Sequence, residues 1–543
     1  MVNDGRVSMI NGKRIVAIIP ARIHTKRVPN KLIRLVGKHP LVYYMINTAI
    51  NSDYIDEIIV STDSVKIALL ARQLGVNCIM RDPSICKDET PLDIVVYEAI
   101  KQIECDFCVT LQPTSPLLKT QTLDDALKKC VYDDVDSVIS VINSPRLAWK
   151  NEKIPKPLYE ERLNSQYLPP YYEETGAFLI TKKECISENN RIGNKIRLYE
   201  VSKEEAVSVC DFQDLALVNA IINQKKVAIY VNGNNSRGMG HVYRALELAD
   251  EFYEKVDLYF DINETSEIVF GETDYNLISV DGIKGLYEAL NDKEYDIFIN
   301  DILYTTKEYV DNLKSIMPNT KIVNFEDEGT GIYSADLVIN ALLSSNNANN
   351  VKCGEKYYVA PKSFLFFEPI EIKDRVKNVL VTFGGADPQS YSLQLLKIIS
   401  KNEEFCCYNF VVVVGKATKH IEKIMSYQKN NIKVVYDAQN MAEIMSQVDV
   451  AVTSRGRTGY ELAVMGIPAI AIAQNEREET HYFMSHENGF NYLGRNPSDA
   501  TIEFNLKLLL ESSLDERMEL QRRMLKNNLR DGRSRIIHLI NSL

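Results

Sequence analysis

The stretch Ser236-Arg-Gly-Met-Gly-His-Val-Tyr-Arg244 directly follows an apparent strand, Val227–Val231, and opens an apparent helix. Glycines at 238 and 240 let the backbone approach a ligand closely, and the N–H groups and dipole of a helix start favour a diphosphate. His241 would lie beside that diphosphate. The same pattern also occurs in an ordinary tight turn that carries a surface histidine. If it binds a ligand, a second mononucleotide-binding fold begins halfway along the chain.

Length and charge limit the classes of protein that this chain can belong to. A chain of 543 residues, 45% of them hydrophobic, predicts several domains, each with its own core. The net charge of −11 argues against a general nucleic-acid or anionic-membrane surface. No apolar run approaches spanning length, and the ten cysteines show no repeated spacing. We therefore expect a cytoplasmic protein with reduced thiols and small-molecule substrates, without a nucleic-acid partner or a membrane span.

Strand-like runs alternate with amphipathic stretches along the whole chain, which predicts α/β architecture with parallel sheets. In the first half these runs are 15–19, 57–61, 107–111 and 137–141. In the second half, two strands each lead into a glycine turn and a helix: Val227–Val231, and Asn378–Phe383 before Gly384-Gly-Ala-Asp-Pro388. The doubled second half resembles the two Rossmann-like lobes of the GT-B fold, with the ligand between them.

A basic loop follows the first strand of the first half. Its five cations have no acid among them: Arg22, Lys26, Arg27, Lys31 and Arg34. At the carboxyl end of a parallel strand, such a loop suits a triphosphate and can stabilise the charge of a leaving pyrophosphate. The alternative is a solvated basic loop without a ligand.

Further motifs in the first half make its resemblance specific. They are Val60-Ser-Thr-Asp63, Arg81-Asp-Pro83 with Asp88, Leu111–Pro116 and Glu174-Thr-Gly-Ala-Phe178. With the basic loop, they make residues 13–222 resemble the CMP-sialic acid synthetase family, cytidylyltransferases that activate nonulosonic acids.

This resemblance implies roles for particular residues. Arg22 and Lys31 would contact the CTP triphosphate and assist catalysis, Arg81 would bind the nucleotide, and Gln112 the acceptor sugar. Lys26, Arg27 and Glu174 would complete the substrate site. Asp211 or Asp214 would hold Mg²⁺, the cofactor that assists in-line attack of the acceptor hydroxyl on the α-phosphorus of CTP. A homodimer through this domain is a further expectation.

Some positions depart from the family pattern. These are Ile23, His24, Leu32, Leu118 and Ser165, and the two metal aspartates are compressed into Asp211-Phe-Gln-Asp214. They leave open an alternative in which the first domain binds nucleotide, or acts as a scaffold, without catalysing transfer.

A nucleotide-binding pattern also occurs near the end of the second half. The buried-type strand Asp449–Thr453 leads into the loop Ser454-Arg-Gly-Arg-Thr-Gly459, whose hydroxyl and N–H groups can hold a diphosphate. Glu461 can accept hydrogen bonds from ribose hydroxyls. The alternative is a capping box formed by Thr458 and Glu461.

These motifs, with Asn300-Asp301, Phe325-Glu-Asp327 and Gln474–His481, make residues 227–543 resemble the UDP-sugar hydrolases of pseudaminic acid biosynthesis, relatives of the MurG glycosyltransferase. His241 would then be the general base, assisted by Asp301, whose alternative role is a strand-end cap. The implied UDP-sugar ligands are Gly238, Gly240, Arg244, Gly385, Ser454, Arg457, Thr458, Glu461, Asn475 and Glu478.

Together, the two resemblances predict a Rossmann-like, GT-A-like nucleotidyltransferase domain (1–225) followed by a GT-B-type module with lobes 226–377 and 378–543. They imply a bifunctional enzyme that transfers a cytidylyl group from CTP to a nonulosonic acid and hydrolyses a UDP-2,4-diacetamido-2,4,6-trideoxyhexose. A glycosyltransferase in the second half is the alternative.

Overall fold

The structure, a computed structural model, describes residues 10–543 except 88, 152–153, 234–238, 347 and 439. The chain forms two compact units, residues 1–224 and 225–543. Within the described residues, no helix is both long and apolar enough to span a membrane.

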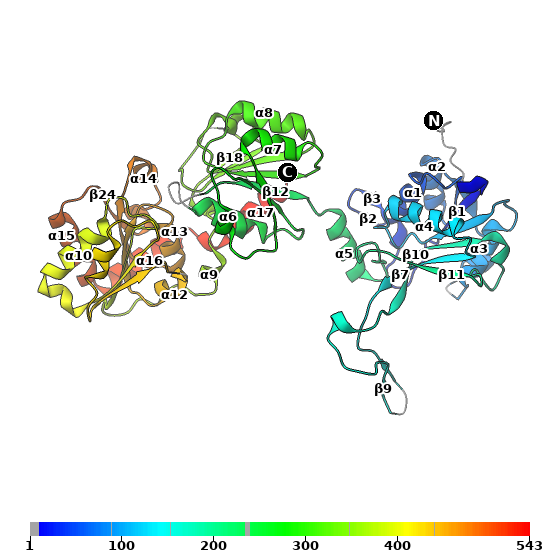
Figure 1. The fold of residues 1–543 in the computed structure, drawn as a ribbon, viewed down its shortest axis with the longest axis horizontal. Coiled ribbons are helices and arrows are strands. Elements are labelled where there is room, and N and C mark those ends of the chain that lie inside the picture. Colours follow the sequence, from blue (N-terminus) through cyan, green and yellow to red (C-terminus); the bar gives the residue numbers. More distant parts are fainter. Residues whose placement is uncertain (1–9, 88, 152–153, 234–238, 347, 439) are drawn as a thin grey trace. The chain divides into compact units, whose positions relative to one another are not determined.

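The first unit is built on one seven-stranded sheet with the order β11-β7-β10-β6-β1-β4-β5 (Figure 1). All neighbours pair in parallel except β10, which is antiparallel to β6 and β7. The strands are β1 Ile15–Ala21, β4 Glu57–Thr62, β5 Asn77–Met80, β6 Phe107–Leu111, β7 Ser137–Asn143, β10 Tyr172–Lys182 and β11 Ile196–Glu200. The four strands expected in this half are all present.

Helices cover both faces of this sheet, because its central strands are apolar on both sides. Helices α1 Leu41–Ile50, α2 Val65–Gln73, α4 Thr120–Tyr132 and α5 Phe212–Ile222 contribute to the main core. Helix α3 Leu92–Ile100 packs on the other face against Val16, Ile18 and Cys108.

An arm extends from the sheet between β7 and β10 (Figure 1). It contains a short antiparallel pair, β8 Trp149–Lys150 and β9 Lys156–Pro157. Several large apolar side chains of the arm and its base are exposed: Trp149, Ile154, Leu158, Tyr167, Tyr171 and Tyr172.

The second unit contains two parallel sheets, as the doubled sequence pattern predicts. The first has the order β14-β13-β12-β15-β16-β17-β18 and the second β21-β20-β19-β22-β23-β24. Their strands are β12 Val227–Val231, β13 Asp257–Asp261, β14 Asn276–Val280, β15 Ile297–Asp301, β16 Lys321–Phe325, β17 Leu337–Asn340, β18 Val351–Cys353, β19 Asn378–Thr382, β20 Asn409–Val414, β21 Ile432–Tyr436, β22 Val450–Ser454, β23 Ala469–Ala473 and β24 Phe490–Arg495.

The helices between and after these strands complete two lobes. In the first lobe they are α6 Gly240–Ala249, α7 Gly282–Leu290 and α8 Lys307–Ile316. In the second they are α10 Tyr391–Lys401, α11 Ile421–Met425, α12 Met441–Ser446, α13 Thr458–Met465, α14 Glu476–Thr480, α15 Asp499–Glu511 and α16 Leu514–Leu525, with α9 Lys362–Leu365 between the lobes.

The last helix corrects one expected lobe boundary. Helix α17, Gly532–Asn541, buries Ile536 and Ile540 in the core of the first lobe, beside Val227 and Val242. The first lobe therefore includes the end of the chain, and a second lobe of 378–543 is too long by this helix. The sequence does not reveal that α17 packs on the first lobe, because the apolar stripe of a helix does not indicate which core it joins.

Candidate active sites

The basic loop of the first unit lies at the carboxyl edge of the sheet, directly after β1. Because β1 and β4 pair in parallel, Ala21 lies opposite Thr62 and the two loops that follow are neighbours. The carboxylate of Asp63 accepts a hydrogen bond from the N–H of Ile23 at 2.8 Å. Asp63 therefore fixes the start of the loop next to Arg22.

Lys31 connects the basic loop to a segment far along the chain. Its side chain is buried, and Nζ donates a hydrogen bond to the carbonyl of Val209 at 2.7 Å. Burial lowers the pKa of Lys31; Arg27 and Arg22 act in the same direction, while Cys210 and Asp214 oppose it. The structure thus brings together charges that are far apart in the sequence.

Arg81, the residue directly after β5, joins the same site. Its Nε donates to Oγ of Ser61 at 2.9 Å and its Nη2 to the Ser61 carbonyl at 2.7 Å. Burial lowers the pKa of Arg81, Asp63 opposes this, and Arg22 adds to it. Arg22 is therefore close enough to influence both Arg81 and Lys31, whereas Lys26 and Arg27 are exposed on the loop.

Gln112 and Glu174 share a small hollow, of about 40 Å³, on the neighbouring strands. Strand β10 shifts register between Glu174 and Leu179, a bulge of the kind found beside active sites. Gly176 has φ +73°, and a Cβ there would lie 2.9 Å from Nε2 of Gln112. The glycine therefore makes room for the Gln112 amide.

The same hollow is lined by Arg191, which the sequence analysis missed. Its Nε donates to Oδ1 of Asp93 at 2.6 Å. Arg191 lies in the segment between β10 and β11, outside every recognised motif. No sequence signal distinguished it from other surface arginines.

The two predicted metal ligands form a reciprocal cap at the start of α5. Oδ1 of Asp211 accepts the N–H groups of Gln213 and Asp214, and Oδ2 of Asp214 accepts those of Cys210 and Asp211. The other oxygen of each carboxylate takes no part in this capping box. The described residues contain no cluster of three or more metal-ligating side chains. Two carboxylates fit Mg²⁺ when substrate phosphates complete its coordination.

The second unit contains a cleft of about 520 Å³. Residues of both lobes line it, including Gly240, Arg244 and Glu326 from the first and Met441, Arg457 and Glu461 from the second. Gly238 lies outside the described residues.

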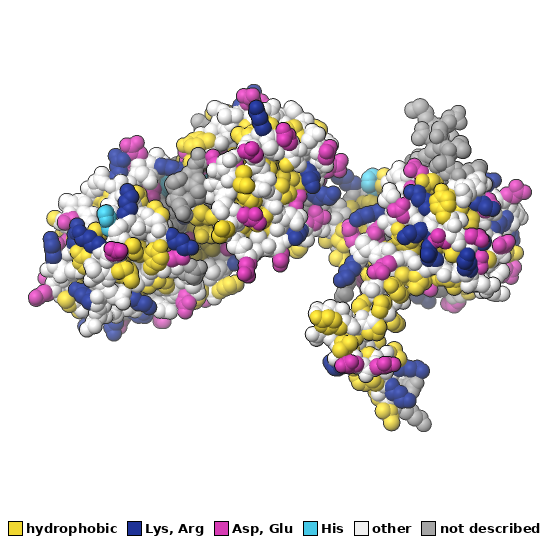
Figure 2. Space-filling model, viewed as in Figure 1, with side chains coloured by type: hydrophobic (Ala, Val, Ile, Leu, Met, Phe, Trp, Pro, Cys, Tyr) yellow, Lys and Arg dark blue, Asp and Glu magenta, His cyan; other side chains and the backbone are white. Residues whose placement is uncertain are grey.

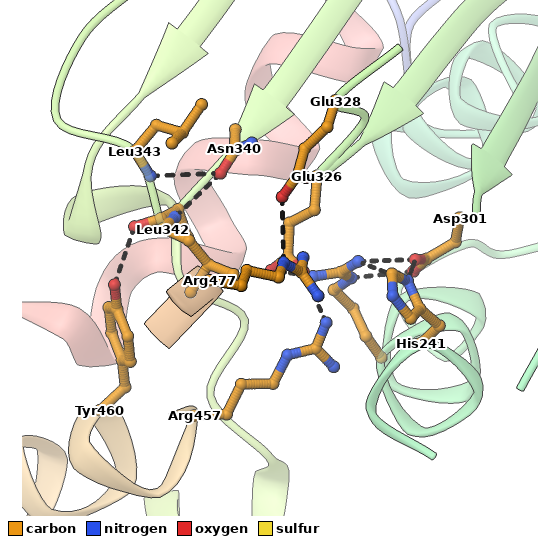
Figure 3. Close-up of polar contacts among 12 residues, drawn as sticks. His241, Asp301, Glu326, Glu328, Asn340, Leu342, Leu343, Arg457, Tyr460 and Arg477 are labelled. Atoms are coloured by element: carbon orange, nitrogen blue, oxygen red, sulfur yellow. Dashed lines mark hydrogen bonds and ion pairs between the residues drawn. The ribbon is translucent and has the colours of Figure 1, made fainter. Parts of the chain in front are cut away.

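His241 and Asp301 form a close pair beside this cleft (Figure 3). The distance from Nδ1 of His241 to Oδ1 of Asp301 is 2.6 Å. Arg244 donates to the same carboxylate from Nε at 2.8 Å and from Nη2 at 2.6 Å. Burial alone would raise the pKa of Asp301, but Arg244, aided by His241, lowers it. Asp301 is thus an ionised acceptor of side-chain hydrogen bonds, which the strand-end cap alternative did not anticipate.

Glu326 is a second buried carboxylate in the cleft, and the sequence analysis gave it no role. It forms ion pairs with Arg244 of α6 and, from Oε2, with Nη2 of Arg457 at 2.6 Å. Despite its burial, these two arginines hold the pKa of Glu326 well below its usual range. The motif Phe325-Glu-Asp327 was the signal that could have identified it.

The loop 454–459 and helix α13 place Arg457 and Glu461 in the cleft, and Ser454 is buried at the end of β22. Helix α13 begins at Thr458, and its N-cap residue is Arg457, which makes no side-chain cap. The capping-box alternative for Thr458 and Glu461 is therefore wrong. Burial raises the pKa of Glu461 to about 7, and Arg457 opposes that rise.

Five predicted ligands are not among the described residues that line the cleft: Gly385, Ser454, Thr458, Asn475 and Glu478. Gly385 packs against Gly415, whose Cβ would lie 2.5 Å from its Cα. The Asn475 side chain caps α14 by accepting the N–H of Glu478 at 2.9 Å. The Glu478 carboxylate accepts the N–H of Gln474 at 2.8 Å.

Comparison with known protein families agrees with both halves of this description. Residues 16–157 match the family described as Cytidylyltransferase, and residues 378–532 match the Glycosyltransferase family 28 C-terminal domain.

Three relatives match different shares of the chain. A Helicobacter pylori protein, named pseudaminic acid cytidylyltransferase and UDP-2,4-diacetamido-2,4,6-trideoxy-beta-L-altropyranose hydrolase, is 24% identical over 87% of this chain and 91% of its own length. The spore coat polysaccharide biosynthesis protein SpsG of Bacillus subtilis is 26% identical over 46% of this chain and 78% of its own. An uncharacterized protein of Methanocaldococcus jannaschii is 27% identical over 47% of this chain, and the match spans 57% of that protein.

Proposed function

We propose that this chain, which joins a cytidylyltransferase-family domain to a module of the glycosyltransferase family 28 type, catalyses two reactions of nonulosonic acid biosynthesis. The first unit transfers a cytidylyl group from CTP to a nonulosonic acid of the pseudaminic type. The second hydrolyses a UDP-2,4-diacetamido-2,4,6-trideoxyhexose to UDP and the free sugar. The observation that carries this proposal is the similarity, through both units, to the Helicobacter pylori protein named for both activities.

The geometry of the first unit supports the transfer reaction. An acceptor hydroxyl attacks the α-phosphorus of CTP, and pyrophosphate leaves. Arg22 and Lys31 neutralise the charge that develops on the phosphates, while Arg81 holds the nucleotide. Asp211 and Asp214 would hold Mg²⁺, which supplies further charge neutralisation when bound.

The hollow beside this loop supports binding of an acidic acceptor. A nonulosonic acid carries a carboxylate, and Arg191 offers a guanidinium suited to it. Gln112 and Glu174 offer hydrogen-bonding groups to the sugar. Arg191 thus supplies an arginine to a unit that has Leu118 and Ser165 at two positions where the resembling family has arginine.

The His241 pair supports hydrolysis at the anomeric carbon. Because the ionised Asp301 only accepts hydrogen bonds, Nδ1 of a neutral His241 carries the proton and Nε2 is left as the base. Nε2 removes a proton from water as the UDP leaves. Arg457 contacts the diphosphate, and Glu461 accepts hydrogen bonds from the ribose.

The transferase test measures pyrophosphate and UDP release separately on one protein. Arg22→Ala and Asp211→Asn should lower pyrophosphate release by orders of magnitude and leave UDP release unchanged. Unchanged pyrophosphate release in Arg22→Ala would contradict the loop assignment. CTP binding without pyrophosphate release in the wild type would support the alternative of a non-catalytic first unit.

The hydrolase test follows the water oxygen. His241→Asn should reduce UDP release by a factor of about 10² to 10⁴ while UDP affinity stays nearly intact. In ¹⁸O water the label should enter the free sugar. Label in UDP would mean attack at phosphorus, and the anomeric mechanism would be wrong.

A glycosyltransferase is the second candidate for this unit, because the matching family is a glycosyltransferase family. UDP release that depends on an added carbohydrate acceptor, with no free sugar formed, would favour it.

The exposed arm supports a homodimer through the first unit, in the cytoplasm where CTP is available. Hydrophobic side chains gather along it (Figure 2), and exposed apolar patches of this kind mark interaction sites. Trp149→Ser with Leu158→Ser should lower the mass measured by light scattering to that of one chain. An unchanged mass would exclude the arm as the interface.

A further inference from the structure

Five charged side chains of the second unit, all but Arg457 buried, form a continuous chain from the first lobe to the second (Figure 3). The order is His241, Asp301, Arg244, Glu326 and Arg457, and each contacts the next. The first four belong to the first lobe, and Arg457 belongs to the loop of the second lobe that precedes α13. Glu326 is the only one of the five that contacts an arginine on each side.

We propose that Glu326 is a positioning residue that ties the orientation of the His241–Asp301 pair to the nucleotide-binding loop of the second lobe. This inference deepens the proposed hydrolase function and rests on it. Glu326 acts through the two arginines and takes no proton from the substrate.

The backbone at Glu326 supports a dedicated position. Its φ is +50°, a left-handed conformation that is strained for a residue with a Cβ. Such strain persists where the surroundings fix the residue, and it is found most often at functional sites. Here it places the carboxylate between two guanidinium groups.

Because the Glu326 carboxylate is buried, it depends on its charged partners and is held in one place. The Glu326 side chain is 3% exposed and that of Arg244 is 9% exposed. A buried charge that loses its partner is strongly destabilised, so the three charges keep one arrangement. Arg244 also donates two hydrogen bonds to Asp301, so a shift of Arg244 moves Asp301, the hydrogen-bond partner of His241.

The position of Arg457 links this chain to the ligand. A Cβ at Gly240 would lie 1.8 Å from Nη1 of Arg457, so the guanidinium packs directly on the first turn of α6. A diphosphate bound at loop 454–459 would meet Arg457, and Glu326 carries the resulting change in Arg457 to Arg244.

The chain offers a matched control in Glu328. It also follows β16 and pairs with an arginine of the second lobe, since Nε of Arg477 donates to its Oε1 at 3.0 Å. The Glu328 and Arg477 side chains are 30% and 39% exposed, and the hydrogen bonds described for them involve none of the five. Surface pairs of this kind contribute little.

The first experiment compares Glu326→Gln with Glu328→Gln, variants that remove one charge with almost no change of shape. We expect kcat for UDP release to fall about 10²-fold in Glu326→Gln, because small misplacements of a base have effects of that size. KM should change less than threefold, and Glu328→Gln should stay within twofold of the wild type. A lowered Tm with unchanged kcat, or equal effects of both variants, would overturn the inference.

The second experiment needs no turnover. UDP is added to ¹⁵N-histidine-labelled protein, and the ring signal of His241 is assigned by its loss in His241→Gln. UDP should shift this signal in the wild type and in Glu328→Gln, and not in Glu326→Gln at saturation confirmed by calorimetry. An equal shift in Glu326→Gln would overturn the positioning role alone. Failure of UDP to bind the wild type would overturn the proposed function and this inference with it.

Discussion

Gly240 shows how a single residue in the cleft is constrained by a neighbour rather than by its own backbone. The Arg457 guanidinium occupies the space that a side chain at position 240 would need. We expect Gly240→Ala to displace Arg457, to raise KM for the UDP-sugar about tenfold and to lower kcat. Steady-state UDP release checks this. Gly285→Ala is the control, since its Cβ would meet only ordinary contacts at 3.7 Å and beyond; equal effects of both changes would contradict the argument.

Glu461 connects a residue of the cleft to pH. Burial raises its pKa from 4.5 to about 7, so between these values the folded protein binds more protons than the unfolded chain. This contribution to stability is fully present below pH 4.5 and is lost as the pH rises through 7. We expect Glu461→Gln to flatten this part of the stability profile by on the order of 1–2 kcal/mol, allowing for water in the cleft.

Urea unfolding at pH 4.5, 6 and 8 measures this effect. The exposed Glu422→Gln should keep the wild-type profile, and an unchanged profile in Glu461→Gln would contradict the shifted pKa.

Glu461→Ala should also raise KM for the UDP-sugar with little change in kcat, because ribose contacts are made equally in ground and transition states.

At the scale of elements, helix α17 couples the end of the chain to the start of the second unit. Ile536 is fully buried beside β12 and α6. Ile536→Ala should lower the free energy of unfolding by about 2–5 kcal/mol through lost burial and the cavity left behind. Urea denaturation measures it, and the exposed Ser534→Ala should change stability by less than about 0.5 kcal/mol. A small effect of Ile536→Ala would mean that α17 is not part of the first-lobe core.

At the scale of the whole molecule, the two compact units predict separable thermal transitions. Each unit has its own sheets and cores, so calorimetry of the intact chain should resolve two transitions. CTP should raise one Tm and UDP the other, each by the equivalent of about 2.7 kcal/mol at a hundredfold excess over Kd. Either ligand raising both equally would contradict independent units.

The sequence by itself determined the class of fold and predicted the loops at which phosphates would bind. Apolar runs predicted β1, β4, β6, β7, β12, β19 and β22, because buried parallel strands need continuous apolar segments. Basic and glycine loops at strand ends predicted where ligands bind, because parallel strands present their carboxyl ends at one edge.

Only the tertiary structure decided which distant charges meet. Arg191 lines the hollow beside Gln112 although it lies outside every motif, and Glu326 joins two arginines that its motif does not identify, since contacts between loops depend on how sheets and lobes pack. The packing of α17 on the first lobe and the absence of a Thr458 cap were also decided there. A side chain's neighbours far along the chain are set by the three-dimensional path of the backbone, which local periodicity does not encode.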